Sequence, residues 1–234
     1  METTHLTERI ERPQVLAVAR VLSRVYVVLT VLGTLYLLAT VLLSTGPIPI
    51  RLPVQQFWPQ IPEGVEVLDG PTAQVTGGGF THAEVDVLGL GWDVRVWLAA
   101  GYLTQGLVSA AIAAAVYRLS VRFDRWGSFQ PCLTKAVRLA GIAVMVGGLV
   151  WQICFSIAGS MASQQTLVYT AWGGPREASP TINGPINDGP IGVGAAPDFS
   201  IDFWPILVGI ALLAASAALR YGEKLERANT SLPA

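Results

Sequence analysis

Four long stretches without a charged residue constrain this chain more than any other feature. They cover residues 25–43, 96–117, 139–159 and 203–219. A helix of about 20 apolar residues crosses the roughly 30 Å hydrocarbon core of a bilayer, because each residue adds about 1.5 Å. A helix buried in a water-soluble protein normally keeps a polar face, which these stretches lack. We therefore predict an all-α membrane protein, a bundle of four transmembrane helices.

Only 13% of the residues are charged, whereas soluble domains usually carry about 25%. The first apolar stretch is longer than the hydrophobic region of a secretory signal, which has about 7–15 residues, and no clear cleavage site follows it. We interpret it as an uncleaved signal anchor.

The lysine and arginine residues predict the orientation of the spans. Twelve of the fifteen lie on one side, in segments 1–24, 118–138 and 220–234. The other three are Arg51, Arg95 and Arg176, in segments 44–95 and 160–202. Because basic residues accumulate in the cytoplasmic flanks of membrane helices, we predict that both termini are cytoplasmic and that 44–95 and 160–202 face outward.

The first outer segment, 44–95, is predicted to contain a small β unit. Its prolines between positions 47 and 62 favour an extended, irregular lead-in. Residues 65–76 and 83–88 then show short β-branched runs, separated by turn residues such as Asp69-Gly70 and the glycines at 77–79. This pattern is typical of a hairpin followed by a strand.

The second outer segment, 160–202, offers one strand candidate at 166–169. The stretch 173–197 is rich in Gly, Pro, Asn and Asp, a composition that favours irregular structure. We expect this stretch to lie over the small β unit or to be mobile.

On the cytoplasmic side, residues 1–24 predict a short interfacial helix with Pro13 in its first turn. Arg20 and Arg24 share a face of that helix, which suits an anchor that sets orientation or, alternatively, a contact with a cytoplasmic partner. The hairpin 118–138 is predicted to turn at residues 126–129, with Pro131 starting the third helix.

The sequence contains no Gly-x-Ser-x-Gly, phosphate-loop, His-Glu-x-x-His or Gly-x-Gly-x-x-Gly motif. His82 lies near Asp69, Glu84 and Asp86, which allows an outer metal site or a solvated loop histidine. One histidine with scattered carboxylates does not define metal geometry, so the solvated histidine is favoured. We predict no catalytic residue, no cofactor and no metal site.

The two cysteines are not expected to form a disulfide. Cys132 and Cys154 are separated by 22 residues of one predicted helix, which is roughly 33 Å. A disulfide requires Cα atoms within about 7 Å.

None of the four spans contains Asp, Glu, Lys, Arg or His, the groups that mark ion paths and proton relays in membranes. The strongest polar groups are Gln105 and Gln152, which are interpreted as interhelical hydrogen-bonding residues or, alternatively, as a shared polar pocket. Small residues recur at four-residue spacing and permit close helix contacts, within the bundle or between copies. These pairs are Ala110/Ala114, Ala211/Ala215 and Ala214/Ala218.

Two motifs give the chain a resemblance to a family of small bacterial four-helix membrane proteins, domain of unknown function 2975. One is Gly127-Ser128-Phe129 followed by residues 135–141, and the other is residues 220–225 after the last span. The chain lacks an asparagine expected at the start of the third helix, and its outer segments are longer. The resemblance implies a bacterial plasma membrane and an association with regulation, but it implies no catalytic residue.

These observations predict a non-enzymatic regulator, sensor or accessory subunit of a membrane complex. The expected partners are the lipid bilayer and a membrane protein or a second copy, with no nucleic acid. The alternative is a small-solute transporter or channel component, which requires a polar path that the spans hardly provide. An intramembrane enzyme ranks third, because no nucleophile or metal cluster is found.

The orientation can be tested by cysteine labelling of whole cells in a background without Cys132 and Cys154. We expect a cysteine at Thr81 or Asn187 to react with a membrane-impermeant reagent, because both positions are predicted to face outward. Cysteines at Ser128 and Thr230 serve as the inward controls and should not react. Labelling at Ser128 would contradict the predicted topology.

Overall fold

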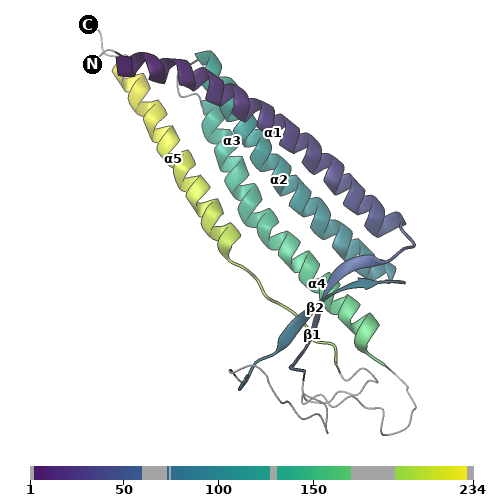
Figure 1. Cartoon of the computed structure of the whole chain (residues 1–234). Coiled ribbons are helices and arrows are strands. Elements are labelled where there is room, and N and C mark those ends of the chain that lie inside the picture. Colours follow the sequence, from purple (N-terminus) through teal and green to yellow (C-terminus); the bar gives the residue numbers. More distant parts are fainter. Residues whose placement is uncertain (1–2, 60–72, 74, 127–130, 170–192, 231–234) are drawn as a thin grey trace, which may run out of the picture. The chain divides into compact units, whose positions relative to one another are not determined.

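The structure is a computed structural model that describes residues 3–59, 73, 75–126, 131–169 and 193–230. The chain is mostly helical, with one small sheet (Figure 1). The helices are α1 (Thr3–Leu43), α2 (Trp92–Trp126), α3 (Pro131–Ile142), the π-helical turn η1 (Ala143–Gly147), α4 (Gly148–Leu167) and α5 (Trp204–Thr230). The strands are β1 (Ile48–Phe57) and β2 (Phe80–Val87).

Within the described ranges, four helical segments are long and apolar enough to cross a membrane: Ala17–Leu43, Trp92–Val121, Thr134–Leu167 and Trp204–Gly222. They confirm the predicted four-helix membrane fold and indicate a multi-pass membrane protein. Pro131 starts α3 as predicted, but α1 begins at Thr3. The prediction that Pro13 lies in a first helical turn is therefore wrong.

The strand predicted at 166–169 is also wrong, because α4 continues to Leu167. Residues 160–165 carry no charge, proline or glycine that would end a helix. Thr166 occupies the last turn, where its hydroxyl donates to the carbonyl of Ala162 at 2.8 Å. This bond to the preceding turn is available to threonine within a helix, so its β-branched side chain did not determine the local structure.

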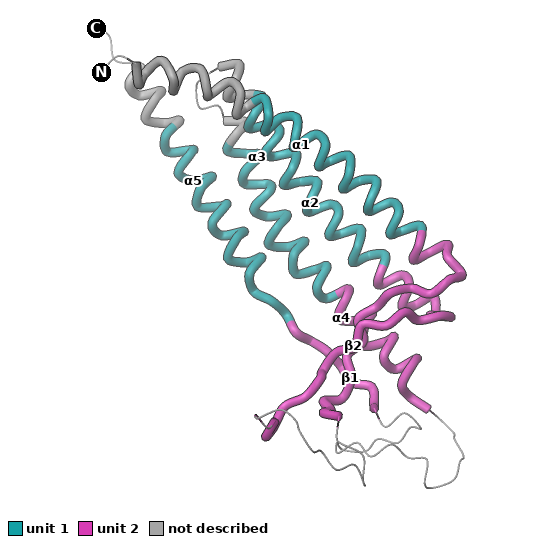
Figure 2. The backbone as a smooth tube through the Cα atoms, in the orientation of Figure 1, with its two compact units in different colours: residues 1–39, 99–153, 201–234 teal, residues 40–98, 154–200 magenta. Residues whose placement is uncertain are grey.

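The chain divides into two compact units (Figure 2). Unit 1 comprises residues 1–39, 99–153 and 201–234, and contains most of the helical spans. Unit 2 comprises residues 40–98 and 154–200, and contains the sheet. Predictions for 65–72, for the turn at 127–129 and for most of 173–197 fall outside the described residues. The strand predicted at 73–76 is wrong where the structure describes it, because residues 73, 75 and 76 are not in a strand.

Within unit 1, close helix contacts depend on glycine. A Cβ atom added to Gly209 of α5 would lie 2.7 Å from the Cβ of Met145 and 3.0 Å from the carbonyl oxygen of Gly141. Gly106 of α2 has the same role against Thr34 of α1, where a Cβ would overlap the threonine side chain. Small residues let helix backbones approach in the absence of a hydrophobic driving force between spans, and these contacts hold neighbouring helices together.

The sheet of unit 2 is an antiparallel pair in which Ile48 lies opposite Val87 and Pro53 opposite His82. Strand β2 confirms the strand predicted at 83–88. Its partner is the proline-rich stretch, for which an extended, irregular conformation was predicted. The stretch is extended as predicted, but the prediction that it is irregular is wrong, because it forms β1. In β1 the alternate residues Ile48, Ile50, Leu52 and Val54 are buried, so burial of one face stabilises the strand.

Proline is tolerated in β1 because of the edge on which it lies. Pro49 and Pro53 are four residues apart, so their backbone groups point to the same side of β1. Proline has no N–H to donate, so it is confined to strand edges where no donor is needed. At this edge the carbonyl of Pro53 accepts a bond of 2.5 Å from Ser163 Oγ of α4. Gly159, one turn earlier in α4, allows the carbonyl of Arg51 to approach.

We expect Gly209→Ala to destabilise the protein, because its methyl group would overlap Met145 and the Gly141 carbonyl. Overpacking of this kind costs about 1–3 kcal/mol. Gly33→Ala is the matched control, since a Cβ at Gly33 meets nothing within 4 Å. Thermal unfolding in detergent should give a lower midpoint for Gly209→Ala than for wild type and for Gly33→Ala. Equal midpoints for the two variants would contradict this account of the α5 contact.

Candidate functional site

The most connected polar cluster of the described residues lies in unit 2 and is centred on Asp198. His82 Nε2 lies 2.7 Å from Asp198 Oδ2, and about three quarters of each side chain is covered. The backbone N–H of Ser200 donates to Asp198 Oδ1 at 3.0 Å. Thr81 Oγ1 lies 3.0 Å from the other ring nitrogen of His82. Both nitrogens of the imidazole are therefore engaged.

Helix α4 fixes the backbone of the same aspartate. The Asp198 N–H donates to Ser160 Oγ at 3.1 Å, and Ser156 Oγ donates to the Asp198 carbonyl. Ser156 and Ser160 are four residues apart, so they lie on one face of α4. Asp198 thereby joins α4, through its backbone, to β2, through its side chain.

The pKa of the Asp198 carboxyl is shifted below its ordinary value of 3.8. Burial is the largest single influence and raises the pKa, but the hydrogen bond and charge of His82 and the bonds from Ser200 outweigh it. Hydrogen bonds to the ionised form favour that form. The carboxylate is therefore anionic throughout the neutral range.

The structure corrects the expectation of a solvated histidine at position 82, because His82 is paired with Asp198. His82, Glu84 and Asp86 alternate along β2, which places neighbouring members about 7 Å apart on one face. Among the residues that the structure describes, no group of three His, Cys, Asp or Glu side chains could hold a metal.

The two predicted glutamines have different environments. Gln152 bonds the backbone of Asp202 twice, accepting from its N–H at 2.7 Å and donating to its carbonyl at 3.2 Å. Gln105 is exposed on α2. No hydrogen bond joins Gln105 to Gln152 in the described part of the chain.

Sequence reasoning missed a role for Arg95 beyond its charge. Its guanidinium donates to the carbonyls of Ser44 at 2.8 Å and Val41 at 3.4 Å, and its Nε donates to Leu90 at 3.0 Å. The first two carbonyls belong to the C-terminal end of α1, where carbonyls lack helical partners and the helix dipole favours a cation. Only the fold brings these positions together.

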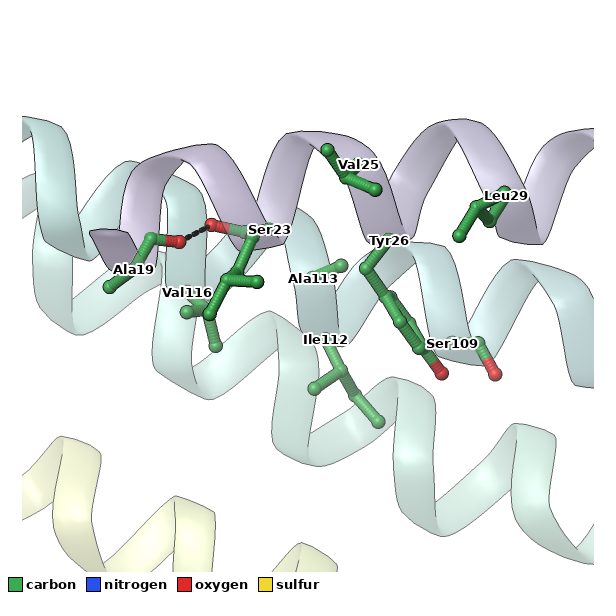
Figure 3. Close-up of a pocket in the computed structure, with 10 residues that line it drawn as sticks. Ala19, Ser23, Val25, Tyr26, Leu29, Ser109, Ile112, Ala113 and Val116 are labelled. Carbon is green, nitrogen blue, oxygen red and sulfur yellow. Dashed lines mark hydrogen bonds between the residues drawn. The ribbon is translucent and has the colours of Figure 1, made fainter. Parts of the chain in front are cut away.

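A groove of about 610 Å³ lies between α1 and α2 of unit 1. Its walls are mainly apolar, and Figure 3 shows Val25, Tyr26 and Leu29 of α1 with Ile112 and Val116 of α2 around it. The hydroxyl of Ser23 donates a hydrogen bond to the carbonyl of Ala19. The groove presents a surface that suits hydrocarbon, without a charged group among its lining residues.

Comparison with protein-family models, curated proteins and solved structures finds no match for this chain. The interpretation of its sites therefore depends on its own geometry.

We expect the stability of unit 2 to depend on the ionised Asp198 carboxylate. Because the pKa is lowered on folding, this contribution is complete above the ordinary carboxyl pKa of about 3.9 and is lost as the pH falls through the folded value. At pH 7 Asp198→Asn should lower stability by about 1 kcal/mol.

Thermal unfolding in detergent between pH 7 and pH 3 measures this effect. The higher unfolding midpoint of wild type relative to Asp198→Asn should disappear below about pH 4. Glu84→Gln, on the same strand but without an observed bond to Asp198 among the described contacts, should retain the wild-type pH dependence. A difference in unfolding midpoint between wild type and Asp198→Asn that stays constant from pH 7 to pH 3 would contradict a stabilising role of the ionised Asp198 carboxylate.

Proposed function

We propose that this chain is a non-enzymatic regulator, sensor or accessory subunit of a membrane complex. We further propose that it lies in a bacterial plasma membrane with both termini in the cytoplasm and with segments 44–95 and 160–202 outside. The orientation is supported by the distribution of the basic residues. The bacterial membrane and the regulatory context are supported by the resemblance to domain of unknown function 2975.

The observation that carries this proposal is an exposed face of α5. Leu207 and Tyr221 are 69% and 65% exposed, and between them lie exposed alanines at helical spacing. These alanines are Ala211, Ala214 and Ala218. Inside the chain, α5 packs through other residues, including Gly209 and Pro205. Helix interfaces in membranes are enriched in small residues, so the alanine face fits a helix from another protein or a second copy.

A binding role also agrees with the distribution of polar groups. The Asp198 cluster and Arg95 lie in unit 2, whereas the predicted spans contain no Asp, Glu, Lys, Arg or His. A coupled carrier normally keeps such a group at an internal cavity. A sensor or accessory subunit needs only an organised outer part and helix faces for association.

Purification in mild detergent with mass spectrometry of the bound proteins tests the proposal. We expect a membrane partner or a second copy to copurify at a fixed stoichiometry with wild type. Ala214→Leu should reduce this association about tenfold, equivalent to about 1.4 kcal/mol, because the larger side chain separates the helices. Ala39→Leu, at an exposed position of α1, is the matched control and should leave the association unchanged.

Two outcomes would count against the proposal. One is a chain that remains monomeric and without partner in native membranes, shown by crosslinking. The other is gradient-driven solute uptake by the purified protein alone in liposomes, which would favour the transporter alternative.

A further inference from the structure

A pocket of about 440 Å³ lies between α3 and α5 in unit 1. Its lining residues are Thr134, Lys135 and Arg138 of α3 with Leu213, Ser216, Ala217 and Arg220 of α5. Three of these seven residues are cationic, two carry hydroxyls and none is a carboxylate. This composition differs from the apolar groove between α1 and α2.

The packing of the two helices explains why the cations gather there. Helices α3 and α5 lie side by side and antiparallel (Figure 1), and they approach most closely where Gly141 faces Gly209. From that contact the pocket lies toward the beginning of α3 and toward the later turns of α5. Arg138 precedes Gly141 by three residues and Arg220 follows Gly209 by eleven, so both lie beyond the glycine contact at one end of the seam.

The charges of the pocket suit an anionic ligand. Lys135, Arg138 and Arg220 are all exposed, and no ion pair with a carboxylate is observed for them among the described residues. Mutual repulsion of three cations within one pocket is unfavourable unless a counter-charge reduces it. The first turn of α3, which begins at Pro131, adds the positive end of a helix dipole.

The surface next to the pocket favours a lipid over a small free anion. Toward the middle of the spans, the helices expose large apolar side chains: Leu139 is 62% exposed on α3, and Ile210 is 52% exposed on α5. Cations at the end of a span with hydrocarbon-compatible surface beside them match a phospholipid, whose phosphate lies at the interface and whose acyl chains lie below it. Basic pockets between membrane helices bind anionic headgroups in this way.

We propose that the pocket between α3 and α5 binds the phosphate headgroup of an anionic phospholipid. Lys135, Arg138 and Arg220 bind the phosphate oxygens, and the hydroxyl-bearing residues Thr134 and Ser216 line the pocket with them. Arginine is suited to this task because its planar guanidinium donates two parallel hydrogen bonds to phosphate. Three cations exceed the single charge of phosphatidylglycerol, so a lipid with two phosphates, such as cardiolipin, should bind most tightly.

The test is native mass spectrometry of the full chain in a non-ionic detergent. The protein is titrated separately with cardiolipin, phosphatidylglycerol and phosphatidylcholine. We expect affinity to decrease in that order, and to decrease with rising salt because the headgroup contacts are electrostatic. Equal affinity for phosphatidylcholine and the two anionic lipids would overturn the proposal.

Variants assign the binding to this pocket. Arg138→Gln and Arg220→Gln should each weaken cardiolipin binding about fivefold, whereas Arg138→Lys should retain most of it because the charge is kept. Arg118→Gln is the matched control, since Arg118 is an exposed cation of α2 that does not line the pocket. A loss for Arg118→Gln as large as that for Arg138→Gln would show a general charge effect and overturn the assignment.

Two further measurements keep the result interpretable. Thermal unfolding identifies a variant that no longer folds. If an arginine variant fails to fold, Lys135→Gln provides an independent substitution at the same pocket, and we expect it to weaken cardiolipin binding by the same factor. Competition with millimolar inorganic phosphate distinguishes the sources of the anion. The control is a simple salt at the same ionic strength, since salt alone weakens electrostatic binding. Displacement of cardiolipin by phosphate well beyond the effect of this control would indicate a site for a small soluble anion and would overturn the lipid proposal, whereas equal displacement would support it.

Discussion

Backbone N–H and C=O groups that lack partners in hydrocarbon cost several kcal/mol each, and this constraint organises the whole chain. Within a span the α-helix satisfies every such group, which is why apolar stretches of different composition all become helices. The constraint is relaxed only where the chain leaves hydrocarbon. The sheet formed by β1 and β2 consequently lies in unit 2, between helical segments.

The same constraint explains the polar contacts of unit 2 and of the helix ends. Where regular structure stops, side chains take over the backbone groups that it leaves. Arg95 donates to the carbonyls of Val41 and Ser44 where α1 ends, Ser163 donates to the carbonyl of Pro53, and Gln152 bonds both backbone groups of Asp202. Polar side chains that resemble isolated features in the sequence therefore act as connectors between segments distant along the chain.

Packing between spans follows a different rule, because lipid tails solvate apolar side chains as well as a protein interior does. Close approach through small residues then decides which helix faces meet. The sequence contains many small residues, but it does not show which of them lie at helix contacts. In the structure Gly141 and Gly209 form the contact between α3 and α5, while Ala211, Ala214 and Ala218 remain exposed. The proposed lipid pocket depends on this contact between α3 and α5, since the pocket lies at one end of it.

The sequence by itself determined the four spans and the strand at 83–88, because span length, missing charge and residue alternation are local properties. It could not determine that β2 pairs with the proline-rich stretch, because proline has no N–H to donate to a sheet. Burial of Ile48, Ile50 and Leu52 compensates for that missing donor, but only after the chain has folded. Likewise, 116 residues separate His82 from Asp198. Only the tertiary structure decided that pair, because no local pattern encodes a contact between two segments that meet through folding.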